Sequence, residues 1–205
     1  MYEKTKFHFL KENCINEFGN EKGNSIYTHS SNRLKELLKE KDYIENHKIR
    51  KHLDTHFFPL MAYYLTLNEF NFSKKESYKL AYKEIEKLAN IKKKRNEKLM
   101  KIPFFYYIFR LIAKSYINYK WSKKAWKTEW IKQDNEEIHF KFHDCVYFNI
   151  TKKYGCSEIC KLFCAEDTIS NSGYYPKIIF ERKQSIGRGD RYCDFRFKNG
   201  NNKNK

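Results

Sequence analysis

The sequence predicts an α+β fold, in which a helical N-terminal two thirds is packed with a small, mainly antiparallel C-terminal sheet. Apolar residues recur at helical spacing through most of residues 1–130, whereas they alternate with polar residues after that point. No internal repeat and no Gly/Ser linker divides the 205 residues. We therefore expect one domain over residues 1–198, with a mostly helical part over 1–130, a sheet and site-bearing part over 131–198, and a disordered tail over 199–205.

Three helices are predicted before residue 70, and their approximate ranges are 4–18, 32–46 and 49–69. Gly19 and Gly23 are expected to break the first of them. The third is apolar all round in its second half, which predicts a helix that crosses the core. Pro59 lies inside it and predicts a kink or a restart, because proline removes a backbone donor.

Two further helices complete the N-terminal part. Ser73 and Glu76 have the spacing of a capping box, which predicts the start of a helix that runs to about Met100. Its expected apolar stripe consists of Tyr78, Ala81, Tyr82, Ile85 and Leu88. Pro103 is expected to begin the next helix, which extends to about residue 121.

The most apolar stretch of the chain is residues 102–117, IPFFYYIFRLIAKSYI. It is shorter than the ~20 residues that a membrane-spanning helix needs, and Arg110 and Lys114 interrupt it. A helix that is buried or faces a partner is the first interpretation. Aromatic residues on one side and basic residues on the other leave a helix on a membrane surface as the alternative.

After Trp130 the pattern becomes that of a sheet with short helices. Ile138, Phe140 and Phe142 alternate with polar residues, as in a half-buried strand. The expected later elements are a helix over 146–154 that ends at Gly155, a helix capped by Ser157, and a hairpin with strands over 175–186 and 191–198 joined by the turn Gly-Arg-Gly-Asp.

Composition limits the class of protein. The formal net charge is +17, but the basic residues are spread along the chain and interleave with glutamates, as on solvated helix faces. Without a nucleic-acid-binding motif, nucleic acid is not expected as a partner. The N-terminal residues carry charges and do not form a signal peptide, so we expect a cytoplasmic protein whose cysteines are thiols.

Five of the six cysteines fall between residues 145 and 193. Cys160, Cys164 and Asp167 are spaced i, i+4 and i+7, which places them on one helical stripe. A thiol one turn from a carboxylate can act as a nucleophile with its proton partner, or both can bind a metal. The alternative is that the two cysteines are small core residues and Asp167 is a surface acid.

The predicted hairpin places Arg182 and Cys193 on its apolar side. A buried guanidinium needs an acid or a bound anion, and Glu158, Asp167 or a substrate carboxylate could serve. A structural Arg–Asp pair beneath the sheet is the other interpretation.

Cys156 and Cys160 are four residues apart rather than in C-x-x-C spacing, which predicts neither a redox dithiol nor a zinc ribbon. Cys145, Cys164 and Cys193 could converge on a metal, but no metal is assigned and the cofactor is left open.

Two C-terminal runs resemble the L-2-amino-thiazoline-4-carboxylic acid hydrolase family: DCVYFNITKKYGCSEICKLFCAED (residues 144–167) and FERKQSIGRGDRYCDFRF (180–197). The similarity extends upstream to about residue 49. Val146 and Ser157 stand where the family has prolines. The second run is similar, more distantly, to 4-vinyl reductase-type ligand-binding domains, but Arg182 and Ser185 occupy the offsets of their zinc ligands.

The resemblance implies a hydrolase that acts on the carbon–nitrogen bonds of a cyclic amidine, attacking the C=N carbon of a thiazoline carboxylate. It assigns Cys164, or Cys145 in second place, as nucleophile or water-orienting thiol, and Asp167 as acid/base. Arg182 and Glu158 would bind the substrate carboxylate, and Cys193 would line the pocket. Two other classes stay open: a small-molecule-binding module without turnover, and a basic adaptor that docks on nucleic acid or membrane.

Overall fold

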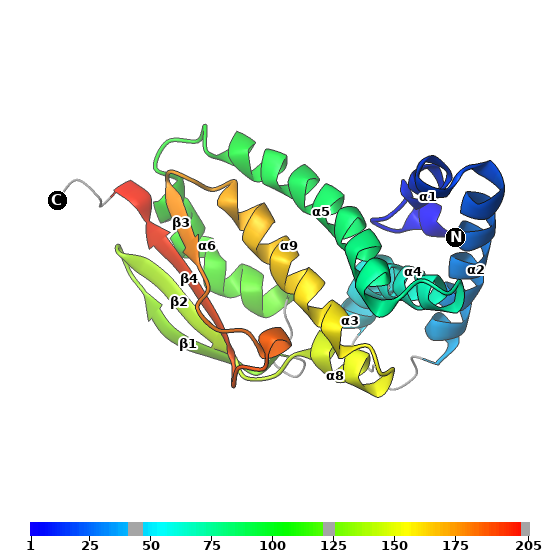
Figure 1. Cartoon of the computed structure of the whole chain (residues 1–205). Helices are drawn as coiled ribbons and strands as arrows, with labels where there is room; N and C mark the ends of the chain where they lie inside the picture. Colours follow the sequence, from blue (N-terminus) through cyan, green and yellow to red (C-terminus); the bar gives the residue numbers. More distant parts are fainter. Residues whose placement is uncertain (41–46, 121–125, 202–205) are drawn as a thin grey trace. The chain divides into compact units, whose positions relative to one another are not determined.

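The computed structural model describes residues 1–40, 47–120 and 126–201. The chain forms two compact units, Met1–Leu88 and Ala89–Lys205, which are described separately. The predicted α+β class is confirmed, with helices first and a four-stranded antiparallel sheet in the C-terminal part (Figure 1). A single domain over residues 1–198 stays a prediction. No helix in the described part of the chain combines the length and hydropathy needed to cross a membrane.

The first unit is helical. Its elements are a 3-10 turn η1 (Tyr2–Lys4), α1 (Leu10–Phe18), α2 (Asn20–Lys39), α3 (His47–His52), a π-helical turn η2 (Leu53–Phe57), α4 (Phe58–Glu69) and α5 (Lys74–Leu99) as far as Leu88. Helix α2 packs on both α1 and α4. Large side chains such as Leu34, Phe57 and Tyr64 are fully buried between these helices and form the core.

The prediction that Gly23 breaks a helix is wrong. Helix α2 begins at Asn20 rather than near Asn32, and it runs straight through Gly23. A Cβ atom on Gly23 would lie 2.5 Å from the backbone oxygen of Cys14, so glycine here allows α1 and α2 to approach closely. The predicted end of this helix falls on residues 41–46, outside the described residues.

Two other predictions for the first unit are confirmed. Pro59 lies in the first turn of α4, directly after the π-helical turn, so the helix restarts there. Ser73 and Glu76 form the capping box, in which the Ser73 N–H donates to Glu76 Oε2 at 2.9 Å and the Glu76 N–H donates to Ser73 Oγ at 3.3 Å.

The buried stripe of α5 in this unit differs from the predicted one. Ala81, Ile85 and Leu88 are buried as expected, whereas Tyr78 and Tyr82 are only half-buried. Leu80 and the carboxylate Glu84 are buried instead. Glu84 accepts a hydrogen bond from Asn13 Nδ2 at 2.6 Å, and burial raises its pKa to about 7.

Glu84 is expected to make stability pH-dependent. Because its pKa rises from 4.5 to about 7 on folding, the folded state retains a proton that the unfolded state loses. The free energy of unfolding should therefore fall as pH rises between these values, by about 3 kcal/mol. Urea unfolding of the wild type and Glu84→Gln at pH 4.5 and 8 checks this: the variant should lose less stability. Glu21→Gln, at an exposed position, is the control, and an equal effect of both variants would contradict the assignment.

The second unit contains the sheet. After the end of α5, its elements are α6 (Phe105–Lys120), β1 (Thr128–Gln133), β2 (Glu137–Phe142), α8 (Val146–Lys153), η3 (Ser157–Ile159), α9 (Cys160–Ser172), β3 (Ile178–Glu181), η4 (Ile186–Arg188) and β4 (Cys193–Asn199). The strand order is β1-β2-β4-β3, and every neighbouring pair is antiparallel (Figure 1). The predicted α8 helix and the β3–β4 hairpin are confirmed.

Four details of this unit differ from the predictions. Strand β1 was missed, because its register shifts between Trp130 and Lys132 and breaks the alternation. Strand β3 is only four residues long, and the hairpin connection holds η4 rather than a tight turn. Ser157 does not cap α9, whose N-cap is Ile159. The predicted tail begins too early, since Asn199 is the last residue of β4.

One face of the sheet is aromatic and buried. In the β2–β4 ladder Phe140 pairs with Phe195, and their rings stack at 5.2 Å. Phe109 of α6 reaches the same layer, 5.4 Å from the ring of Phe197. The opposite face is polar, as the alternation predicts, although His139 is buried there against Asp194 at 2.7 Å. The aromatic layer fixes β3 and β4, and helix α9 packs against β3 and η4.

Candidate active site

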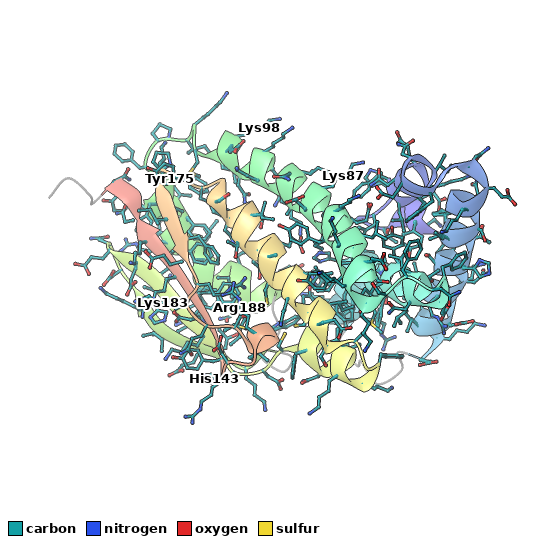
Figure 2. All side chains as sticks on the ribbon, in the orientation of Figure 1. Lys87, Lys98, His143, Tyr175, Lys183 and Arg188 are labelled. Atoms are coloured by element: carbon teal, nitrogen blue, oxygen red, sulfur yellow. The ribbon has the colours of Figure 1, made fainter. Side chains whose placement is uncertain are left out.

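Four cysteines from three elements meet beside the η4 turn. Cys145 is the N-cap residue of α8, Cys160 and Cys164 lie on α9, and Cys193 begins β4. All four are buried thiols. Gly187 of η4 lies against the cluster, since a Cβ atom there would be 3.1 Å from both the Cys160 and Cys164 sulfurs. The packing of α9 against η4 therefore brings together thiols that are distant in the sequence. Arg188, the neighbour of Gly187 in η4, is labelled in Figure 2.

Cys160 lies between two other thiols. Hydrogen bonds with Cys145 and Cys164, together with burial, raise its pKa. A thiol has one proton, so Cys160 can donate it to only one of these two neighbours at a time. Because its pKa is raised, Cys160 is the neutral member of the three.

The pKa of the Cys164 thiol is lowered. The hydrogen bond from Cys160 lowers its pKa most, the Arg182 guanidinium and the Ser185 hydroxyl lower it further, and the net pKa is about 6 although burial acts in the opposite direction. Cys164 is also 9% exposed, compared with 1% for Cys160. A partly accessible thiolate at neutral pH is the state that a cysteine nucleophile needs.

Cys145 is a second thiol with a lowered pKa. The largest cause is the hydrogen bond from Cys160, and the backbone N–H groups of Phe148 and Tyr147 at the start of α8 add to it. Helix N-termini stabilise thiolates in this way. Cys193 differs, because burial raises its pKa to about 12 and its sulfur accepts a hydrogen bond from the Ile186 N–H at 3.3 Å. Cys193 is thus a neutral thiol that lines the cluster.

Arg182 supplies the cation. Its side chain is only 4% exposed, and its Nη1 donates to Asp167 Oδ2 at 3.0 Å. Its Nη2 donates to the backbone oxygen of Cys164 and to Thr168 Oγ1. The guanidinium lies over the ring of Phe195, 5.1 Å from its centroid. The buried guanidinium thus has the acid partner that the sequence predicted, and that partner is Asp167.

The structure brings together most of the predicted site residues. Cys145, Cys164 and Cys193 interact electrostatically with one another or with the thiol between them, and Arg182 joins Asp167 to this group. Asp167 is 37% exposed and is the member that reaches solvent. Glu158 is half-buried in η3, the turn that precedes α9. Within residues 1–40, 47–120 and 126–201, no group of three His, Cys, Asp or Glu side chains could hold a metal ion.

Sequence reasoning missed two contributors on the η4 turn. Ser185 is buried, and its hydroxyl is one of the groups that lower the pKa of Cys164. Gly187 provides the space for the two α9 sulfurs. The sequence placed Ser185 at the end of the predicted strand over 175–186 and Gly187 at the start of the predicted Gly-Arg-Gly-Asp turn, and neither position carries a site motif.

The pKa of Cys164 predicts how its reactivity depends on pH. The rate of alkylation by iodoacetamide at Cys164 should be half-maximal near pH 6 and fall below it, because only the thiolate reacts. Peptide mapping after brief labelling at several pH values gives the rate for each cysteine. Cys193 is the internal control, since its raised pKa should keep it unlabelled at neutral pH. Labelling of Cys193 ahead of Cys164 at pH 7 would contradict the assignment.

Comparison with known proteins adds one finding. The family model of the L-2-amino-thiazoline-4-carboxylic acid hydrolases matches residues 50–197, a range that includes the whole thiol cluster. No curated protein and no solved structure matches the chain.

Proposed function

The chain belongs to the L-2-amino-thiazoline-4-carboxylic acid hydrolase family, and on this premise we propose that it opens the ring of a small 2-amino-thiazoline carboxylate, with Cys164 as nucleophile. The observation that carries the proposal is the position of Cys164 on α9, where the Arg182 guanidinium binds the Cys164 backbone oxygen and Asp167, within the segment that the family shares. Cys160, Arg182 and Ser185 lower the pKa of its thiol to about 6. A thiolate is strongly nucleophilic, and the C=N carbon of a cyclic amidine is its natural electrophile.

The first step joins the enzyme and the substrate. The Cys164 thiolate adds to C2 of the ring, the bond from C2 to the ring sulfur breaks, and that sulfur leaves as a cysteine-type thiolate. Such a thiolate has an ordinary pKa of about 8.5 and can leave without a proton donor. The product of this step is an open-chain isothiourea on Cys164 that contains every atom of the substrate.

The second step consumes one water molecule. Water adds to the same carbon, the Cys164 thiolate leaves, and a carbamoyl-cysteine is released with both carbon–nitrogen bonds of C2 retained. Asp167 is the proposed base for this water, because its carboxylate reaches solvent and Arg182 holds it beside the Cys164 turn of α9. The addition is to the C=N bond, whereas the bond that finally breaks is carbon–sulfur.

The other predicted residues take supporting roles in this proposal. Arg182 stabilises the Cys164 thiolate and positions Asp167, and a substrate carboxylate would share the same guanidinium. Cys193 lines the site as a neutral thiol. Cys145 is the second choice of nucleophile because its pKa is also lowered. A contribution of Glu158 to carboxylate binding stays a prediction.

The test is turnover of 2-amino-thiazoline-4-carboxylate by the purified protein, with the product identified by mass. Parallel reactions contain a divalent metal or a chelator. Formation of carbamoyl-cysteine at an unchanged rate with chelator is the expected result. No product in any reaction, together with a ligand-dependent rise in Tm, would replace the hydrolase by the alternative of a small-molecule-binding module without turnover.

A further inference from the structure

Helix α6 carries a second apolar face that its own unit does not bury. Ala113 is fully buried, whereas Leu111, two residues earlier, is 72% exposed. The exposed apolar side chains of this region are Ile102, Phe104, Ile108, Leu111, Ile112, Tyr116 and Tyr119. The five that belong to α6 are spaced by three, four or seven residues, which places them on one side of the helix. An exposed contiguous apolar stripe of this kind marks an interaction surface.

The charged residues of the segment that contains α6 are all basic. Between Glu97 and Glu129 the sequence contains no Asp or Glu. The same segment contains eight basic residues: Lys98, Lys101, Arg110, Lys114, Lys120, Lys123, Lys124 and Lys127. Arg110 and Lys114 are one turn apart and follow one edge of the stripe. The exposed face is therefore apolar, with Arg110 and Lys114 along one edge and Lys101 ahead of the helix, whereas Lys127 is paired with Asp144.

The residue before the helix adds to this face. Phe104 has a φ of 52°, in the left-handed region that a bulky side chain rarely adopts. Its ring is exposed rather than packed. Packing in the interior of the unit does not account for this strained backbone, because the aromatic ring that it positions lies in solvent. Backbone strain of this kind is typical of a functional segment.

We propose that this face of α6 binds the surface of an anionic lipid bilayer. An interfacial helix needs one apolar face, aromatic side chains at the headgroup level and basic residues that reach anionic headgroups, and α6 has all three. A second copy of the chain fits this face less well. A symmetric contact through α6 would bring together two segments that contain basic residues and no acidic ones, and these would repel each other. The proposal is independent of the hydrolase reaction.

Co-sedimentation with vesicles tests the proposal. The full-length protein is mixed with vesicles of phosphatidylcholine alone or of equal parts phosphatidylcholine and phosphatidylserine, at low and high salt. Partition to the anionic vesicles should exceed partition to the neutral ones and fall with salt, because part of the attraction is electrostatic. The variant Leu111→Ser/Ile112→Ser should partition at least about tenfold less, since it loses the most exposed part of the stripe.

Matched controls separate the face from general effects of substitution. Ile91→Ser changes an exposed apolar residue of another helix and should leave partition unchanged. Lys101→Gln/Lys114→Gln should weaken binding to anionic vesicles about tenfold, whereas Lys74→Gln/Lys75→Gln, at exposed positions of α5, should not. Circular dichroism checks that each variant is folded.

Three results would overturn the proposal. The wild type could fail to bind anionic vesicles, or the Leu111→Ser/Ile112→Ser variant could bind as the wild type does. The third is a dimer in sedimentation velocity that this variant abolishes, without any vesicle binding. That result would assign the face to a second copy of the chain.

Discussion

Cys164→Ala is expected to lower kcat/KM for 2-amino-thiazoline-4-carboxylate by at least about 10³-fold, because it removes the proposed nucleophile. The substitution is small and the site is already packed by neighbouring thiols, so the fold should persist. Steady-state turnover of the wild type and the variant, with circular dichroism of both, measures the effect. Retention of wild-type turnover would transfer the role to Cys145, the other thiol with a lowered pKa.

Two other cysteines provide the matched controls. Cys14→Ala replaces a buried thiol of the first unit and should leave turnover unchanged. Cys160→Ala should keep turnover but move its acid limb from near pH 6 to higher pH, because the hydrogen bond from Cys160 is the main cause of the lowered Cys164 pKa. Loss of turnover at every pH in Cys160→Ala, with activity kept in Cys164→Ala, would contradict the assignment.

Arg182→Met is the second change with a large expected effect. It removes the cation that stabilises the Cys164 thiolate and leaves Asp167 without its partner. We expect turnover at neutral pH to fall about 10²-fold, as for the loss of one electrostatic stabiliser. Because Asp167 is partly exposed and regains solvent, the cost in free energy of unfolding should be modest, about 1–2 kcal/mol. Turnover and urea unfolding measure the two effects.

Arg182→Met has a close control in the neighbouring residue. Lys183 is exposed, so Lys183→Met removes the same charge without touching the cluster. Arg182→Lys keeps the charge but loses the planar arrangement of donors that joins Asp167, Thr168 and the Cys164 carbonyl, so its turnover should fall between the two methionine variants. Wild-type turnover in Arg182→Met, with an unchanged pH dependence of Cys164 alkylation, would exclude the proposed role of the cation.

Local sequence patterns predicted the structure correctly where it depends on interactions between residues that are close in the sequence. The capping box of Ser73 and Glu76 and the restart at Pro59 involve only neighbouring residues, and both are present. The helix over Gly23 and the bulged strand β1 were missed because tertiary packing decides them. A glycine that admits a second helix and a glycine that ends a helix look alike in one sequence.

The candidate site was predictable in part for the same reason. Helical spacing placed Cys160, Cys164 and Asp167 on one stripe, and alternation placed Arg182 and Cys193 on the buried face of the hairpin. The roles within the cluster depend on which thiol donates to which and on the irregular turn that holds Ser185 and Gly187. Such loop geometry leaves no periodic signal in a sequence.

The most direct test of the account is the mass of the enzyme during the first turnover. Wild-type protein is mixed with 2-amino-thiazoline-4-carboxylate, quenched with acid before the first turnover is complete, and mapped by peptide mass. The proposed mechanism predicts a mass increase equal to the whole substrate on the peptide that contains Cys164, and none in Cys164→Ala. Release of carbamoyl-cysteine by the wild type without an adduct, or an adduct on another cysteine, would contradict it.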